Sequence, residues 1–189
     1  MTAELRIDAH TGLVSGASYQ ASPNCDDRPA GMQPELLVVH GISLPPGQFG
    51  GPAISALFCN SLDPAEHPFF AEIAHLRVSA HVLIRRDGSL IQYVPLHRRA
   101  WHAGRSSYCG REHCNDFSIG VELEGCDDIP YEPVQYRRLV SFVHALQAVY
   151  PRITRERIVG HCHIAPGRKS DPGPAFDWQA FFNALDAGD

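Results

Sequence analysis

The sequence predicts a single α/β domain, in which short strands and amphipathic helices share one hydrophobic core. Residues 36–40 form a continuous run of leucine and valine that ends at His40, which is typical of a strand buried on both faces. Residues 133–150 carry apolar side chains at helical spacing and precede a proline, which predicts an amphipathic helix. The chain has 189 residues, of which 44% are hydrophobic and 20% charged, so it suits one domain with an ordinary core and surface.

The first third of the chain divides into an arm and the start of the domain. Residues 1–34 show no sustained period and end in a turn-rich stretch, so we expect an arm packed on the core. Residues 35–189 are then the domain proper. His40 closes the first strand, because residues 41–51 hold two prolines and four glycines and predict a loop. Residues 52–58 suit a short helix with proline in its first turn.

Three further elements follow along the chain. Residues 79–94 predict a β-hairpin, because two apolar segments flank an Asp-Gly pair. Residues 117–124 alternate in character and predict a strand with one apolar face. The opposite face of that strand carries Gly120, Glu122 and Glu124. Residues 177–185 predict a last helix with an aspartate as its N-cap.

Composition argues against several classes of partner. The net charge of −5 at pH 7 has the wrong sign for a protein that binds nucleic acid. The first residues lack the pattern of a secretory signal, and no apolar run approaches the roughly 18 residues of a membrane span. We therefore expect a soluble cytoplasmic protein without membrane contact. In that compartment the cysteines are expected to be mostly buried free thiols, with disulfides as the minor alternative: Cys25, Cys59, Cys109, Cys114, Cys126 and Cys162.

Ionisable residues concentrate between positions 160 and 174. His161, His163 and Asp171 lie there, and together with His40 they offer the nitrogen and oxygen ligands that zinc accepts. His40 lies 121 positions before His161, so the fold must assemble any joint site, and a local zinc finger is disfavoured. In an extended segment His161 and His163 share one face, so the pattern does not rank them.

Other catalytic motifs are missing from the sequence. It contains no G-x-S-x-G elbow, H-E-x-x-H helix, Walker loop or G-x-G-x-x-G turn. A Cys162 nucleophile between two histidines is a minor alternative, because sequence neighbours on a strand point apart. The arginine pairs at 85–86 and 98–99 are interpreted as solvated.

Five blocks of the sequence together resemble one known family. They are LLVVHGISLPPGQFGG, HLRVSAHVLIRRDGSLIQYVP, AWHAG, CNDFSIGVELEG and GHCHIAPGRKSDPGPAFDW. They are similar to the cytoplasmic N-acetyl-anhydromuramoyl-L-alanine amidases of Gram-negative bacteria, within the zinc amidases related to peptidoglycan recognition proteins and phage T7 lysozyme. The resemblance implies a central mixed β-sheet flanked by α-helices and one zinc ion per chain. It also implies hydrolysis of the amide between anhydro-N-acetylmuramic acid and the L-alanine of the stem peptide.

The resemblance also implies roles for individual residues. The positions that match zinc ligands are His40, His161 and Asp171, and those that match the catalytic pair are Glu122 and Lys169. Positions near the substrate are Arg77, Trp101 and His163. The family often has aspartate or asparagine at the position of His163, which favours His161 as the ligand. His113 stands where relatives often carry arginine, which puts one substrate contact in doubt.

The implied site has a chemical interpretation. Zinc lowers the pKa of a bound water to about 7, and Glu122 can move that water's proton to the leaving amine. Lys169, the single lysine of the chain, supplies a compact positive charge for the developing oxyanion. Gly120 leaves room for substrate. Glu124 shares the nominal face of Glu122, so only the resemblance selects between them.

Two functions of different classes fit these residues. The first is the zinc amidase, acting as a monomer on a small glycopeptide. The alternative is a module of the same fold that binds muropeptides without cleaving them. Such modules lose a zinc ligand, whereas this chain keeps all three matching positions and both catalytic partners, which favours the enzyme.

Overall fold

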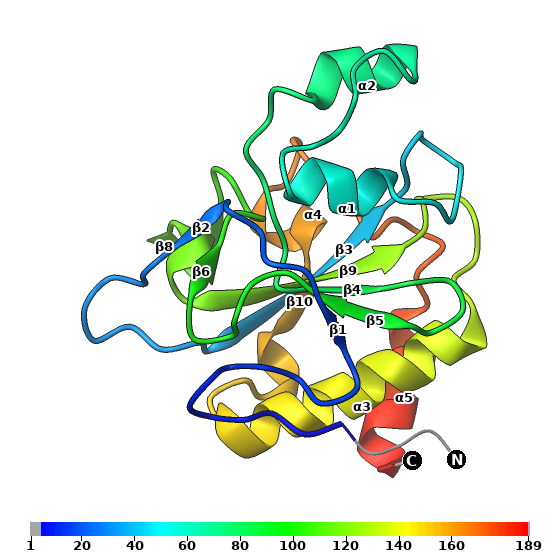
Figure 1. Cartoon of the computed structure of the whole chain (residues 1–189). Helices are drawn as coiled ribbons and strands as arrows, with labels where there is room; N and C mark the ends of the chain where they lie inside the picture. Colours follow the sequence, from blue (N-terminus) through cyan, green and yellow to red (C-terminus); the bar gives the residue numbers. More distant parts are fainter. Residues whose placement is uncertain (1–4, 189) are drawn as a thin grey trace.

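A mixed sheet forms the centre of the protein, whose computed structural model describes residues 5–188. Its strand order is β1-β5-β4-β9-β3-β10, and helices lie on both faces (Figure 1). Only β4 and β5 pair in antiparallel fashion, and the other neighbours are parallel. The strands are β1 (Ser18–Tyr19), β3 (Leu36–Ile42), β4 (Val82–Ile84), β5 (Leu90–Gln92), β9 (Ser118–Glu124) and β10 (Ile158–Gly160). The predicted fold class is confirmed.

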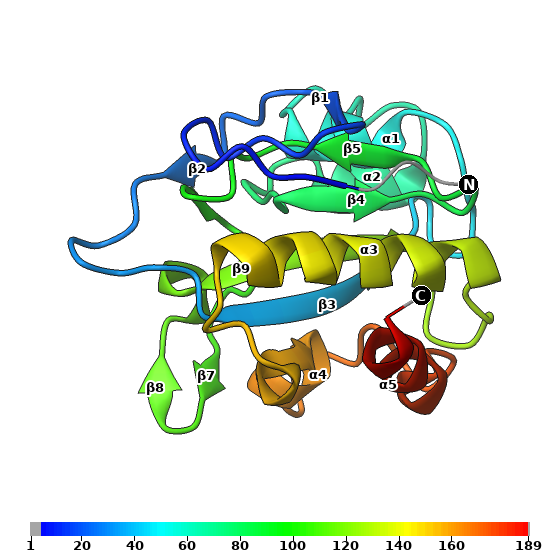
Figure 2. The same ribbon diagram turned by 90° about the horizontal axis from the view of Figure 1, so that it is seen from below.

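The helices cover the two faces of the sheet unequally. The longer helices α3 and α5 lie on one side of the sheet in Figure 1, with α1 and α2 on the other. Figure 2 looks onto the face that α3 crosses. The helices are α1 (Ala53–Phe58), α2 (Pro68–Ile73), α3 (Pro133–Val149), α4 (His161–Ile164) and α5 (Trp178–Ala187), with 3₁₀ turns η1 (Cys114–Asp116) and η2 (Arg155–Arg157). Two-stranded sheets pair β2 (Cys25–Asp26) with β6 (Arg99–Ala100) and β7 (Ser107–Tyr108) with β8 (Arg111–Glu112).

The strand predicted at residues 36–40 is buried on both faces, as expected. Leu37 and Val39 pack with α3 in the largest core cluster, whereas Leu36 and Val38 pack in a separate cluster beside α4. Successive side chains of a strand point to opposite faces, so His40 shares the face of Leu36 and Val38. The candidate ligand therefore lies on the face opposite α3.

The expectation that His40 closes this strand is wrong. β3 continues through Gly41 and Ile42, which pair with Leu123 and Glu124 of β9. A side chain at Gly41 would clash with the hydroxyl of Tyr131, so glycine is what allows the strand to pass there. A glycine in the pattern thus marks a close approach here rather than the end of a strand.

The predicted helices and hairpin are present. In α3, Pro133 is the first residue and the Gln135 side chain accepts a hydrogen bond from the Glu132 N–H, closing a capping box. In α5, Asp177 Oδ1 accepts from the Ala180 N–H at 2.8 Å. The hairpin pairs β4 with β5 around a turn that places Gly88 at φ 80°. These elements were predictable because their signals are local.

The chain before residue 35 contributes to the sheet and to the core. β1 pairs with β5 at the sheet edge, and Leu5 and Val14 join the largest core cluster. Arg28 reaches across the molecule and donates to the main-chain carbonyls of Leu96 and Ser118, among others. The sequence did not predict β1 or β2, because each has two residues and no period of its own.

Several surface assignments need correction. All four arginines of the pairs predicted to be solvated form ion pairs: Arg85 with Glu124, Arg86 with Glu132, Arg98 with Asp27, and Arg99 with Asp26 and Asp116. All six cysteines are free, but Cys114 alone is fully buried and Cys109 is exposed. None of the helices in the described part of the chain has the length and apolarity that crossing a membrane requires.

Two turn glycines allow a matched test of packing at the hairpin. Gly88 and Gly110 have φ of 80° and 77°, but a Cβ at Gly88 would lie 2.6 Å from Val134 Cγ2, whereas one at Gly110 meets nothing within 4 Å. We expect Gly110→Ala to lower the free energy of unfolding by roughly 1–2 kcal/mol through backbone strain. Gly88→Ala should lower the free energy of unfolding by about 1–3 kcal/mol more, because Val134 of α3 would have to shift. Urea denaturation measures both, and equal costs would contradict the argument.

Candidate active site

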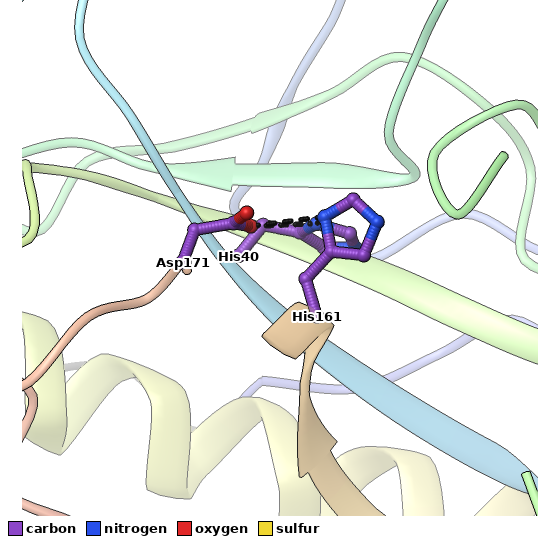
Figure 3. Close-up of side chains that lie close together, drawn as sticks. All are labelled: His40, His161 and Asp171. Carbon is purple, nitrogen blue, oxygen red and sulfur yellow. Dashed lines mark hydrogen bonds and ion pairs between the residues drawn. The ribbon is translucent and has the colours of Figure 1, made fainter. Parts of the chain in front are cut away.

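Three side chains that could bind a metal ion lie close together in the structure. His40 comes from β3, His161 is the first residue of α4, and Asp171 lies on the following loop; their side chains point toward one another (Figure 3). The two Nδ1 atoms are 3.0 Å apart, and Asp171 Oδ2 lies 3.2 Å from that of His40 and 3.1 Å from that of His161. Ligands at tetrahedral Zn–N and Zn–O distances lie about 3.3 Å apart, so this triangle fits zinc.

The sheet topology explains why residues far apart in sequence meet here. β10 pairs in parallel with β3, and Gly160 lies opposite Val39. The next residues along the two strands are His161 and His40, which therefore emerge side by side. The Cys162 N–H donates to the Asp171 carbonyl at 3.0 Å and holds the loop against α4. The fold thus assembles the site, as the sequence separation required.

Hydrogen bonding prepares the three groups for a cation. His161 Nε2 lies 3.2 Å from the Ala103 carbonyl, which can only accept, so this contact favours the tautomer that carries its hydrogen on Nε2 and its lone pair on Nδ1. Burial lowers the pKa of His40 to about 4, so its ring is neutral near pH 7. Burial raises the pKa of Asp171, but the adjoining rings of His161 and His40 outweigh it and hold the pKa well below its usual range. Two neutral imidazoles and a carboxylate are the forms that bind zinc.

Glu122 lies next to His40 on the neighbouring strand. β9 and β3 are in register, with Glu122 opposite His40. Burial raises the pKa of the Glu122 carboxyl well above its usual value, the carboxylate of Asp171 adds to this, and the positive charge of Lys169 opposes it. Within residues 5–188, Glu122 Oε2 is buried without a hydrogen-bond partner. Such a carboxyl group is suited to exchanging a proton with a ligand in the cavity.

Glu124, two residues further on, is engaged elsewhere. Its Oε1 accepts from Arg85 at 3.0 Å and from the Gly50 N–H at 2.6 Å, and its Oε2 accepts from the Arg86 N–H at 3.2 Å. Its side chain is only 2% exposed. Geometry therefore separates the two glutamates, which sequence position alone did not.

The ligand triangle opens into a cavity of about 850 Å³. Glu122, Lys169 and Trp101 all line it. Trp101 is held by a hydrogen bond from its Nε1 to Asp26 Oδ1 at 3.2 Å. The Lys169 ammonium makes no ion pair with any residue between 5 and 188. Apolar side chains also line the cavity and come largely from α1 and α2: Leu57, Phe58, Phe69, Ile73 and Leu76.

Two residues predicted near the substrate do not line this cavity. Arg77 is exposed, and its guanidinium donates to main-chain carbonyls of residues 74–76. His163 is exposed, accepts from the Gly160 N–H at 2.9 Å, and packs 5.6 Å from the Trp178 ring. The assumption of an extended segment is wrong, because residues two apart in the helical turn α4 point about 200° apart. His113 lies in another cavity of about 460 Å³, with Arg105 and Arg168.

Sequence reasoning missed His102 and misread Gly120. The space above Gly120 is filled by the His102 ring, whose Nδ1 would lie 2.6 Å from a Cβ at that glycine, so it is not left for substrate. His102 also lies on the cavity wall. Its only sequence signal was its place inside the block AWHAG.

Comparison with known proteins shows which family the chain belongs to. A profile of the N-acetylmuramoyl-L-alanine amidase family matches residues 30–174. The 1,6-anhydro-N-acetylmuramyl-L-alanine amidase AmpD of Escherichia coli (strain K12) is 61% identical over 170 residues, which cover 90% of this chain and 92% of that protein. A crystal structure of a selenomethionine AmpD derivative has a TM-score of 0.91 at 59% identity and covers 95% of this chain and 98% of its own. The amidase AmiD from E. coli, in complex with the substrate anhydro-N-acetylmuramic acid-L-Ala-D-γ-Glu-L-Lys, has a TM-score of 0.57 at 28% identity over 95% and 65% of the two chains. The chain belongs to the N-acetylmuramoyl-L-alanine amidase family.

Proposed function

We propose that the protein is a zinc-dependent amidase of cell-wall recycling. Its substrate is an anhydromuramoyl-peptide, and it cleaves the amide between anhydro-N-acetylmuramic acid and L-alanine. The observation that carries this proposal is the His40, His161 and Asp171 triangle with the buried Glu122 carboxyl beside it, whose Oε2 has no hydrogen-bond partner among the described residues. The activity of the AmpD relatives and the ligand of the AmiD complex support the substrate class.

The protein is proposed to act in the cytoplasm, as a monomer with one zinc ion. Its six free cysteines are what a reducing compartment maintains. A small glycopeptide released from the wall fits a cavity of about 850 Å³. Peptidoglycan fragments, rather than the intact polymer, are therefore the expected substrates.

The chain's own residues supply proton transfer and charge. Zinc, when bound, polarises the scissile carbonyl and lowers the pKa of a water to about 7. The Glu122 carboxylate takes a proton from the attacking water and then donates it to the nitrogen of L-alanine as the C–N bond breaks. A raised pKa helps this residue to hold the proton between the two steps. Lys169, which lines the same cavity, offers its ammonium to the negative charge that develops on the carbonyl oxygen.

A product assay tests the function directly. Anhydromuramoyl-tripeptide is incubated with the zinc-loaded protein and with the Glu122→Gln variant, and products are identified by mass spectrometry. Free anhydro-N-acetylmuramic acid and free tripeptide are expected with the wild type alone. An uncleaved substrate that nevertheless binds would identify a binding module instead. Faster release from intact wall polymer would overturn the assignment to recycling.

Substitutions of Lys169 test whether the size and shape of its charged group matter as well as its charge. An ammonium is a compact charge on a flexible stem, whereas a guanidinium is planar and wider. We expect Lys169→Arg to keep zinc but to lose at least about tenfold in kcat/KM, which is about 1.4 kcal/mol of transition-state stabilisation. Lys169→Ala should lose roughly 10²–10³-fold, the effect of a missing oxyanion donor.

Steady-state kinetics with zinc measured on the same samples decide the role of Lys169. Arg137→Ala is the matched control, because it removes one positive charge from an exposed position on α3. It should leave the rate unchanged. If the Lys169→Arg enzyme were unimpaired, only the positive charge at this position would matter, and the prediction would be wrong.

A further inference from the structure

The outer nitrogen of His40 begins a line of hydrogen bonds that leads away from the metal site. His40 Nδ1 faces the ligand triangle, and His40 Nε2 lies 2.9 Å from His102 Nδ1. His102 Nε2 in turn lies 3.1 Å from the hydroxyl of Ser118. The rings of His40 and His102 meet edge to face, with centroids 5.0 Å apart at 87°. The described mechanism uses neither His102 nor Ser118.

The direction of these hydrogen bonds follows from the ligand role of His40. A ligand nitrogen must present a lone pair, so a neutral His40 that binds zinc through Nδ1 carries its hydrogen on Nε2. That hydrogen needs an acceptor, and His102 Nδ1 is in place to accept it. His102 then carries its own hydrogen on Nε2, where Ser118 Oγ accepts.

We propose that His102 is a positioning residue, which holds His40 in the tautomer and ring orientation that bind zinc. The inference rests on the proposed zinc site at His40, His161 and Asp171. His102 does not touch the reacting atoms; it acts through His40. Its expected effect is therefore on zinc affinity.

A competing arrangement shows what His102 prevents. His40 can instead carry its hydrogen on Nδ1 and donate to Asp171 Oδ2, which lies 3.2 Å away. His40 and Asp171 are then hydrogen-bonded to each other, and His40 Nδ1 has no lone pair left for zinc. With His102 present, the Nε2–H form of His40 has a partner inside the protein. Without His102, the Nε2–H tautomer of His40 leaves a buried N–H unpaired. The Nδ1–H tautomer, which excludes zinc, then becomes more populated.

The surrounding chain is built to hold His102 in this place. Gly120 has no side chain beneath the ring. The N–H groups of His102 and Ala103 both donate to Asn115 Oδ1, at 3.1 and 2.8 Å. The Ala103 carbonyl accepts from His161 Nε2 at 3.2 Å. Two adjacent residues, fixed by one asparagine, thus hold the outer nitrogens of both histidine ligands.

Two substitutions of His102 separate positioning from packing. Asparagine places a carbonyl oxygen near the position of the ring Nδ1 and so keeps an acceptor, whereas leucine fills the space without one. We expect His102→Leu to weaken zinc binding about 10–100-fold and His102→Asn to recover most of that loss. A residue that only filled space would show the reverse order, because asparagine leaves the larger void.

Zinc affinity is measured on metal-free protein by competition with a chelator, and the absorption spectrum of the cobalt-substituted protein reports the ligand geometry. His102→Leu should change that spectrum, and His102→Asn should restore it. His144→Leu is the matched control, because within residues 5–188 that partly buried ring hydrogen-bonds to the Leu185 carbonyl of α5, at 3.2 Å, and not to the metal site. It should leave zinc affinity unchanged.

A second variant keeps the inference testable if His102→Leu does not fold. Ser118→Ala removes a hydroxyl from a strand residue and should weaken zinc binding less than His102→Leu, by several-fold. Unchanged affinity in the folded His102→Leu protein, or in Ser118→Ala where His102→Leu is unfolded, would overturn the inference. Failure of the wild type to bind zinc would instead contradict the proposed function, so the two failures are distinguishable.

Discussion

The Glu122→Gln enzyme is expected to keep its fold and its zinc but to lose roughly 10²–10⁴-fold in kcat/KM, the usual contribution of a positioned proton-transfer group. The physical reason is that Glu122 is unpaired at Oε2 and lies opposite His40, where a water proton must be taken up and returned. Glutamine keeps the size of the side chain and removes only its basicity. Steady-state rates on an anhydromuramoyl-peptide, with zinc content from the same samples, give the result.

Glu124→Gln is the matched control for this prediction. Glu124 sits on the same strand face, but Arg85 and two main-chain N–H groups already engage its carboxylate. We expect this variant to lose about 1–3 kcal/mol of stability through its weakened charged hydrogen bonds, with near-normal kcat/KM. If Glu124→Gln abolished turnover and Glu122→Gln spared it, the two roles would have to be exchanged.

The elements that the sequence predicted are those whose signals are local. α3 and α5 have apolar stripes and caps, the β4–β5 hairpin has its Asp-Gly turn, and β9 alternates over seven residues. The short strands β1, β2, β6, β7 and β8 have two residues each and exist because a partner strand lies beside them. No residue pattern within such a segment can reveal that partner.

The same holds for the site: the residue types predicted its candidate ligands, whereas the roles of individual residues depend on tertiary contacts. The residue types narrowed the metal ligands to four candidates, and the resemblance favoured His161 over His163. The residue pattern alone did not rank the two, because their directions depend on the backbone at residues 161–164. A helical turn there separates the two rings. Only the resemblance selected Glu122 over Glu124, and the physical difference between them involves Arg85, which lies on another strand's turn and engages Glu124. His102 was missed because its function depends on the neighbouring strands that carry His40 and Gly120.

The two histidines of α4 give the sharpest test of the metal site. His161→Ala is expected to remove most of the zinc and essentially all activity, because it deletes one corner of the ligand triangle. His163→Ala should keep about one zinc per chain, because its ring faces Trp178 and bonds to the Gly160 N–H. Metal content by atomic spectroscopy and rates on the same samples measure both effects.

Removal of the metal from the wild type should reproduce the His161→Ala phenotype and, unlike the substitution, be reversible. Dialysis against a chelator is expected to abolish turnover, and added zinc should restore it. Substitution of His40 or Asp171 by alanine should lower zinc content as His161→Ala does. Full turnover by metal-free protein would exclude a catalytic zinc. Loss of zinc from His163→Ala to the same extent as from His161→Ala would show that the assignment of His161 as the ligand is wrong.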